Sequence, residues 1–227
     1  AAGHHFALEP ALQVGPGPYH TAAGRALFSA IGDSAPDRWG RTLLARRERL
    51  DAKEKGRAPR TLLEIDYLLG LSDFTRQGAL RFKRAEGGPF LAEGGGHVPP
   101  FVELGRLLEA AERVAEEKET EEDLRLLLEP GSSLLGSRPK ASVRGKNGEL
   151  MIAKFNRPDD DYDVGRWEGV AMSLAEMARL NVASWALEQV SGRTVLLMQR
   201  FDRRGEIRIP FLSAMSMLEA VDGEHRS

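Results

Sequence analysis

The sequence contains no cysteine, which excludes disulfides, thiolate metal sites and cysteine nucleophiles. Neither sign of charge dominates, since the net charge is −2, so no overall basic field would attract nucleic acid. The chain has no apolar run of the roughly 18 residues that a membrane helix needs. No charged segment followed by an apolar one opens the chain as a secretory signal would. We therefore expect a cytoplasmic protein.

What the chain does contain is ordinary for a soluble globular protein: 41% hydrophobic and 29% charged residues over 227 positions. This length predicts one large domain or two small ones, with enough residues for a core. Residues 86–100 are rich in glycine and proline, which indicates a loop and the approximate domain boundary.

The most informative stretch is residues 131–154. A glycine-punctuated loop leads into a strand expected at residues 141–144. Asn-Gly turn chemistry at residues 145–148 then predicts a hairpin, and the apolar residues 150–153 predict its second strand, with Lys154 at the far end. Loop N–H groups and a fixed ammonium together are a means of holding polyphosphate.

This pattern fails two strict nucleotide templates. Gly131 and Gly136 have the spacing of a Walker A loop, but Ser137 stands where its lysine should be. The protein-kinase loop G-x-G-x-x-G is also absent. Taken alone, the stretch favours an ordinary hairpin over a nucleotide site.

The residues that follow favour a nucleotide site. Asp163 can cap a helix whose apolar residues recur at helical spacing, which predicts that they form a buried face: Val164, Trp167, Ala171, Leu174 and Ala178. Glu168 lies on this helix and can reach back toward the sheet. A strand lysine paired with a glutamate on the next helix positions nucleotide phosphates in kinases. Strands predicted at residues 185–190 and 194–198, then a polar linker, complete the order of a kinase small lobe and hinge.

Five ordered segments together resemble the HipA-like serine/threonine-protein kinase toxins of bacterial type II toxin–antitoxin modules. They are residues 32–41, 73–82, 131–141, 152–155 and 198–203. The resemblance covers nearly the whole chain, and five motifs in order are far more specific than any one of them.

The resemblance implies a set of ATP-binding residues: the loop Leu135, Gly136, Ser137, Arg138, Pro139 and Lys140, the phosphate contact Lys154, and the hinge Gln199, Arg200 and Phe201. It implies transfer of the γ-phosphoryl group of Mg-ATP to a protein serine. It also implies autophosphorylation of a loop serine, which matches Ser133, although Ser132 is adjacent. The implied partners are a DNA-binding antitoxin of the HipB type and a protein substrate such as an aminoacyl-tRNA synthetase, with DNA contacted only through the antitoxin.

In the family, the catalytic and Mg²⁺-binding residues lie in a helical lobe beyond the hinge, whereas this sequence ends at Ser227. We therefore expect an amino-terminal portion with no catalytic residue or metal ligand of its own. The expected fold class is α+β: an amino-terminal mixed α/β subdomain over 1–100, a kinase-like small lobe with an antiparallel sheet and one helix over 101–200, and the hinge and start of a largely absent catalytic helical lobe over 201–227. The alternative is a non-catalytic module that docks an antitoxin or a separate catalytic lobe. A third reading is a β-rich scaffold without a nucleotide site.

The remaining elements follow from caps and periodicity. Ser34 is the expected cap of a helix to about Leu50, with Trp39 in the core. Thr61 and Glu64 form an expected capping box for a helix that ends before Gly70. Short helices are predicted at 22–31, 104–114 and 214–220, and strands at 79–82 and 207–211. The basic segment 51–60 is expected to be an exposed loop, with an antitoxin or nucleic-acid contact as the alternative.

Overall fold

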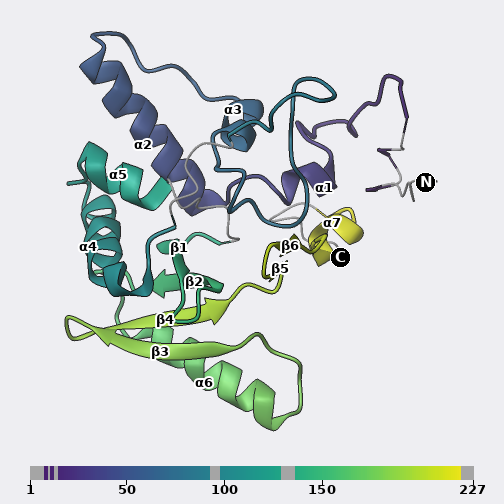
Figure 1. The fold of residues 1–227 in the computed structure, drawn as a ribbon. Helices are drawn as coiled ribbons and strands as arrows, with labels where there is room; N and C mark the ends of the chain where they lie inside the picture. The colour runs from purple at the N-terminus through teal and green to yellow at the C-terminus, as the bar shows by residue number, and fades with distance from the viewer. Residues whose placement is uncertain (1–7, 10, 13–14, 93–97, 129–135, 221–227) are drawn as a thin grey trace.

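The protein has an α+β fold built on a four-stranded antiparallel sheet, as expected from the sequence (Figure 1). The computed structural model describes residues 8–9, 11–12, 15–92, 98–128 and 136–220. The sheet has the order β1-β2-β4-β3. Its strands are β1 (Lys140–Arg144), β2 (Leu150–Phe155), β3 (Trp185–Val190) and β4 (Arg193–Gln199). A separate two-stranded ribbon pairs β5 (Arg203–Arg204) with β6 (Ile207–Arg208).

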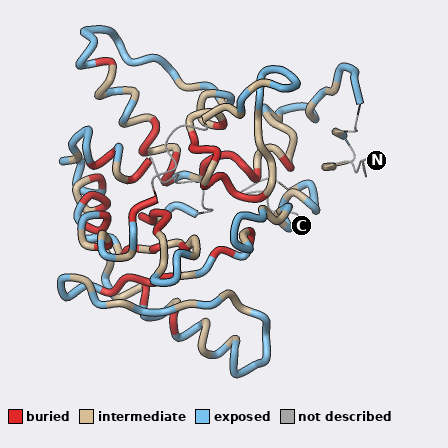
Figure 2. The backbone as a smooth tube through the Cα atoms, viewed as in Figure 1, coloured by how far each residue is buried: buried red, intermediate tan, exposed pale blue. Residues whose placement is uncertain are grey.

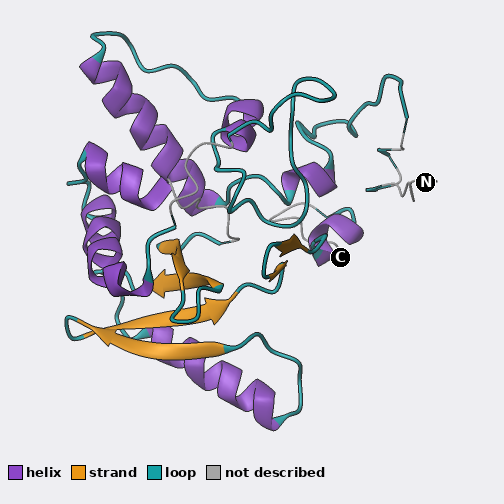
Figure 3. Ribbon diagram, in the orientation of Figure 1, coloured by secondary structure: helices purple, strands orange, loops and turns teal. Residues whose placement is uncertain are grey.

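Helices lie on both sides of this sheet (Figure 3). Their bounds are α1 (Ser29–Gly32), α2 (Arg38–Glu54), α3 (Glu64–Leu69), the 3₁₀ turn η1 (Phe101–Glu103), α4 (Leu104–Ala115), α5 (Glu121–Leu128), α6 (Val164–Met177) and α7 (Ala214–Met217). Helix α4 contacts β1 and β2, and α5 contacts α2 and α4, so these three helices form one layer. Helix α6 packs against β3 and β4 on the other side of the sheet (Figure 1).

The hairpin of β1 and β2 forms where the sequence predicts it. Gly148 adopts a φ of +84°, and its N–H donates to Gly145 O at 3.0 Å, which closes the turn. Alternation along β2 then places Met151, Ala153 and Phe155 on one face. This face joins the main core, which it shares with buried leucines of α2, α4 and α5 (Figure 2).

Lys154 lies on the opposite face of β2 from this core. Its cross-strand partner is Lys140, and directly opposed residues of an antiparallel pair share a face. The sheet therefore presents two lysines at the same point of the face that α6 partly covers.

Several expected elements differ in the structure. Asp37, not Ser34, caps α2, since its Oδ1 accepts from Gly40 N at 2.7 Å. Helix α3 begins at Glu64 rather than after Thr61, because Asp66 accepts from Leu63 N at 2.9 Å and fixes the start there. Residues 79–82 form no strand; only an isolated bridge joins Lys83 to Phe90.

Short elements are shorter than expected. The helix expected at residues 22–31 is only the four-residue α1, Ser29–Gly32. In the strand expected at 207–211, only Ile207–Arg208 pairs. The helix expected at 214–220 ends at Met217. Helix α4 at 104–115 matches the prediction. Ser213 caps α7, since its hydroxyl oxygen accepts from Ser216 N at 3.0 Å.

The predicted buried face of α6 is wrong. Trp167 is 62% exposed and Leu174 is 58% exposed, and Ala171 and Ala178 are exposed as well. The buried residues of α6 are Gly165 and Gly169. The helix approaches the sheet through glycines, because a side chain at Gly169 would meet Leu187 and Trp185 of β3.

The amino-terminal region is fastened to the sheet by buried polar contacts. Trp39 donates its indole N–H to Lys140 O at 2.9 Å. The guanidinium of Arg200, just after β4, donates to Thr75 O at 2.6 Å. The Asp202 carboxylate accepts from Gly78 N at 2.7 Å. The two regions therefore fix each other's positions.

Candidate functional site

Lys154 and Glu168 form an ion pair that joins strand β2 to helix α6. Their side chains are 29% and 30% exposed, so the pair borders solvent. Asp163 sets the start of α6: its Oδ1 accepts from Arg166 N at 3.0 Å, and its Oδ2 accepts from the Thr194 hydroxyl of β4 at 2.5 Å. The helix that carries Glu168 is thus capped and tied to the sheet by one carboxylate.

Lys140 is held deep beside this pair. Its ammonium donates to Asp37 Oδ2 at 2.6 Å and to Gly136 O at 3.2 Å. Both side chains are only 4% exposed. Burial lowers the pKa of Lys140, while Asp37 opposes that shift, and the nearby Lys154 and Arg157 lower it further. Burial likewise raises the pKa of Asp37 against the effect of Lys140. The ammonium therefore connects the amino-terminal region, the sheet and the loop.

The described end of the predicted ATP loop is tied down at several points. Gly136 has a φ of +124°, a conformation that favours glycine. Ser137 O accepts from Arg157 at 2.9 Å, Arg138 pairs with Asp160, and Pro139 O accepts from Phe155 N at 3.0 Å. Leu135, Ser133 and Ser132 lie outside the described residues.

The predicted hinge residues have different roles. The backbone of this segment continues the sheet, with Gln199 N donating to Ser184 O at 2.8 Å and Arg200 N to Leu150 O at 3.1 Å. The Arg200 side chain is buried and pairs with Asp202 at 2.6 Å, so it holds the linker in place. Phe201 is 58% exposed and stacks against Phe211 with ring centroids 5.3 Å apart.

Of the predicted ATP-site residues, the structure brings the two lysines, Glu168 and Gly136 close together, but it does not bring the Gln199 side chain to them. Lys140, Lys154 and Glu168 share one face, and Gly136 touches Lys140. Gln199 pairs with Met151, so its side chain belongs to the other face of the sheet. The Gln199 side chain therefore does not point to the face that carries Lys140 and Lys154. The assignment of these residues to ATP stays a prediction.

The charges on the lysine face suit a polyanion. Lys140, Lys154 and Arg157 are close enough that the latter two depress the pKa of Lys140. An anion placed among them would relieve that repulsion. Within the described ranges, no group of three or more histidines or carboxylates is arranged to hold a metal ion.

Asp37 and Arg157 are members of this cluster that the sequence analysis did not assign to the site. The position of Asp37 near a helix start favoured a local role. The signal that would have found it is the excess of cations in the loop, because a lysine as deeply buried as Lys140 requires a carboxylate partner.

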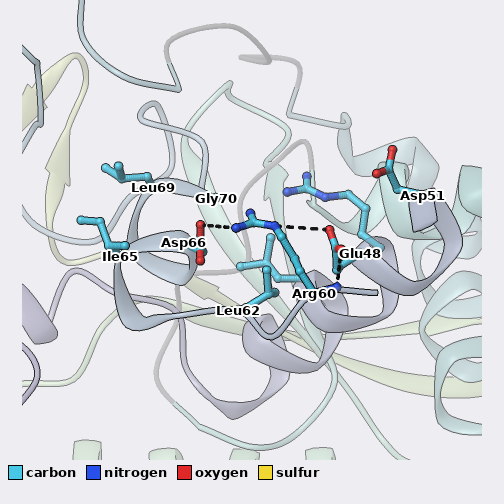
Figure 4. A pocket seen from close by; sticks show the side chains of 10 residues that line it. Glu48, Asp51, Arg60, Leu62, Ile65, Asp66, Leu69 and Gly70 are labelled. Atoms are coloured by element: carbon cyan, nitrogen blue, oxygen red, sulfur yellow. Dashed lines mark hydrogen bonds and ion pairs between the residues drawn. The ribbon is translucent and has the colours of Figure 1, made fainter. Parts of the chain in front are cut away.

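The basic segment 51–60 makes internal ion pairs at the groove between α2 and α3 (Figure 4). Arg60 lies between Glu48 and Asp66, at 3.8 and 3.0 Å, and Arg57 pairs with Glu48 at 2.6 Å and with Asp51 at 2.5 Å. Residues 51–54 continue α2 instead of forming the expected loop, and Ala52 is buried, because the helical hydrogen bonds run on to Lys55 N, which donates to Asp51 O at 3.0 Å. Residues 53–60 are exposed as expected, and the alternative antitoxin or nucleic-acid contact stays a prediction.

Comparison with known proteins gives one family. Residues 132–227 match the model of the HipA-like C-terminal domain, which supports a HipA-like protein. The matched segment contains the sheet, α6 and the described residues of the predicted ATP site. No curated protein matches the chain. In the part of the chain that the structure describes, no helix is both long and apolar enough to span a bilayer.

Proposed function

We propose that this chain is the ATP-binding portion of a HipA-like serine/threonine kinase. The observation that carries the proposal is the ion pair between Lys154 of β2 and Glu168 of α6. In kinases a strand lysine held by a glutamate of the neighbouring helix positions the nucleotide phosphates. The match of residues 132–227 to the HipA-like C-terminal domain supports the same reading.

Each described residue has a role that follows from its position. Lys154 neutralises charge on the phosphates, and its partial exposure leaves room for a ligand. Glu168 keeps the lysine chain extended along the sheet. Lys140, held by Asp37, fixes the end of the loop at Gly136. When bound, ATP would supply the γ-phosphoryl group for transfer to a serine hydroxyl.

The remaining parts of the proposal come from the family resemblance. They are Mg²⁺ as cofactor, Ser133 as the autophosphorylated serine, and a protein substrate such as an aminoacyl-tRNA synthetase. A HipB-type antitoxin is the proposed partner, with DNA reached through it. None of these requires a role for the chain's own carboxylates in metal binding.

An ATP titration by calorimetry tests the proposal. We expect Lys154→Ala to weaken ATP binding by about tenfold or more, because a hydrogen-bonded charge contact contributes about 1.5–3 kcal/mol. Lys146→Ala is the matched control, since Lys146 is an exposed lysine of the β1–β2 turn, paired with Glu188 at 3.3 Å. Equal affinity of the wild-type chain and Lys154→Ala would contradict the proposal.

The second candidate is a docking module, and the exposed apolar stripe of α6 favours it. Trp167, Val170, Leu174 and Met177 are 62%, 46%, 58% and 79% exposed and recur at helical spacing. Exposed apolar patches of this kind often mark interaction surfaces. A chain that binds no ATP, with or without Lys154, would favour this candidate.

A further inference from the structure

A second cationic site lies at the other end of the β1–β2 hairpin from Lys140 and Lys154, in a cavity of about 390 Å³. It is bounded by the β1–β2 turn, by the segment around Phe74, and by the ribbon of β5 and β6 that follows β4. Six of its thirteen lining residues are arginines: Arg81, Arg144, Arg200, Arg203, Arg204 and Arg208. The cavity has the size of a small-molecule site.

Internal carboxylates balance only part of this charge. Asp202 pairs with Arg200 at 2.6 Å and with Arg203 at 2.7 Å. Asp73 pairs with Arg81 at 2.5 Å and with Arg208 at 3.0 Å through the same oxygen, Oδ2. Two buried carboxylates thus serve four arginines.

The other two arginines have no carboxylate partner among the described residues. Arg144 lies 5.4 Å from the Phe74 ring and donates to Gly148 O at 3.2 Å, whereas Arg204 is exposed. Glu149 and Glu206 also line the cavity, so the site as a whole holds six arginines and four carboxylates. Its net charge is positive in a chain whose overall charge is −2.

The arginines also have hydrogen-bonding capacity to spare. Arg208 Nη1 is buried and has no hydrogen-bond partner among the described residues. An unpaired buried donor is costly, and more so when charged. Burial and neighbouring arginines lower the pKa of Arg208, and burial followed by Arg200 lowers that of Arg203 to about 10. An anion that accepts several hydrogen bonds from these guanidinium groups would satisfy the unpaired donor and reduce the repulsion between the arginines.

We propose that this cavity binds a small phosphorylated molecule through a phosphate monoester or diphosphate group. Guanidinium groups suit this ligand because their planar fork donates two parallel bonds to phosphate oxygens. The surplus of positive charge favours a multiply charged phosphate over a single carboxylate. Phe74, beneath Arg144, gives the ligand an apolar surface next to the charged group.

The cavity lies at the end of the β1–β2 hairpin away from Lys140 and Lys154, and it shares Gln199 and Arg200 with the predicted hinge. Lys140, Lys154 and Glu168 are not among its lining residues. Leu150, which lines it, is four residues before Lys154 on β2, a distance of roughly 13 Å along an extended strand. The proposal therefore does not require a phosphate contact at Lys154.

Pyrophosphate is the probe, and the intact chain carrying Lys154→Ala is the background, so that binding at the lysine face does not contribute. We expect calorimetry to detect pyrophosphate binding in this background, weaker at higher salt. Adding Arg204→Gln should weaken binding about tenfold, as for loss of one charged contact. Arg204 is exposed and makes no ion pair with the described residues, so this change should leave the fold intact.

Arg49→Gln is the matched control, because it removes the same charge from an exposed position on α2 that does not line the cavity. Arg144→Gln, at the end of β1, is a second variant and should act like Arg204→Gln. The proposal is overturned if Lys154→Ala abolishes pyrophosphate binding, if neither cavity variant weakens it, or if Arg49→Gln weakens it equally.

Discussion

At the scale of single residues, Asp37 has two roles on two oxygens of one carboxylate. Its Oδ1 caps α2, and its Oδ2 pairs with the buried ammonium of Lys140. Asparagine is as good a cap as aspartate but carries no charge. The variant Asp37→Asn therefore separates the ion pair from the cap.

We expect Asp37→Asn to lower the free energy of unfolding by about 3 kcal/mol, because it leaves Lys140 buried without a counter-charge. Urea unfolding at neutral pH measures this. The double variant Asp37→Asn with Lys140→Met should lose less stability than the two single changes added together. A loss below about 1 kcal/mol for Asp37→Asn would show that the pair is not buried as described.

A second carboxylate controls stability at low pH. Asp123 accepts from Arg113 Nη2 at 2.6 Å and from Thr120 N at 2.9 Å, and its side chain is 5% exposed. These hydrogen bonds, that of Arg113 first, lower the pKa of Asp123 to about 2. Since the folded pKa lies below the unfolded value of about 3.9, the stabilisation is complete above pH 4 and is lost as pH falls toward 2.

We expect Asp123→Asn to reduce the free energy of unfolding by about 2 kcal/mol at pH 7. The difference between wild type and variant should shrink between about pH 4 and pH 2. Urea unfolding at a series of pH values tests this, with the exposed Glu116→Gln as the control. A difference that stays constant down to pH 2 would contradict the role given to the charge.

At the scale of elements, α6 shows what a sequence pattern can and cannot specify. Asp163 and the apolar spacing correctly predicted a helix at this position. The same spacing gave the wrong buried face, because the contact with the sheet is made by Gly165 and Gly169. Periodicity locates the apolar side of a helix. It does not reveal that the helix can approach the sheet more closely on the side where glycines have no side chain.

We expect Gly169→Val to destabilise the protein by about 2 kcal/mol, since an added Cβ lies 3.1 Å from Leu187 Cδ1 and 3.2 Å from Trp185 Cζ3. Valine has the higher helix propensity, so any loss comes from packing. Thermal unfolding measures the loss.

Ala171→Val is the control for this variant, because it adds the same side chain on the exposed side of α6. It should change stability by only a few tenths of a kcal/mol. If both variants have the same effect, the close packing of α6 through Gly169 is not what fixes the helix.

At the scale of the whole molecule, the sequence predicted the carboxy-terminal half better than the amino-terminal half. Strand and turn patterns located β1 to β4, and the pairing of Lys154 with Glu168 was foreseen from their positions on consecutive elements. The buried ion pair of Asp37 and Lys140 was not predicted, because the two residues are 103 positions apart in the sequence. Local patterns carry no information on which distant segments will meet.

The arginine cavity was missed for the same reason. Its walls come from the segment around Phe74, the β1–β2 turn and the β5–β6 ribbon, which are far apart in the sequence. Several of the residues between 73 and 77 are buried, and Arg76 donates to Leu68 O at 2.8 Å. The local sequence does not indicate which distant segments these residues face.

The buried contacts between the two regions lead to a last expectation, that the chain unfolds as one unit. Trp39 of α2 donates to Lys140 O, and Arg200 donates to Thr75 O, so neither region keeps its hydrogen bonds if the other unfolds.

A chain that retains Trp39 alone, with Trp167→Phe and Trp185→Phe, makes fluorescence a reporter of this junction. Its urea transition should coincide with that of far-UV circular dichroism, as in two-state unfolding. Arg200→Met should separate the two transitions, because it removes the buried guanidinium that hydrogen-bonds to Thr75 O. It also leaves the buried Asp202 carboxylate with one cationic partner fewer. A fluorescence transition that precedes the circular dichroism transition in the chain with Arg200 intact would mean that the amino-terminal region unfolds independently.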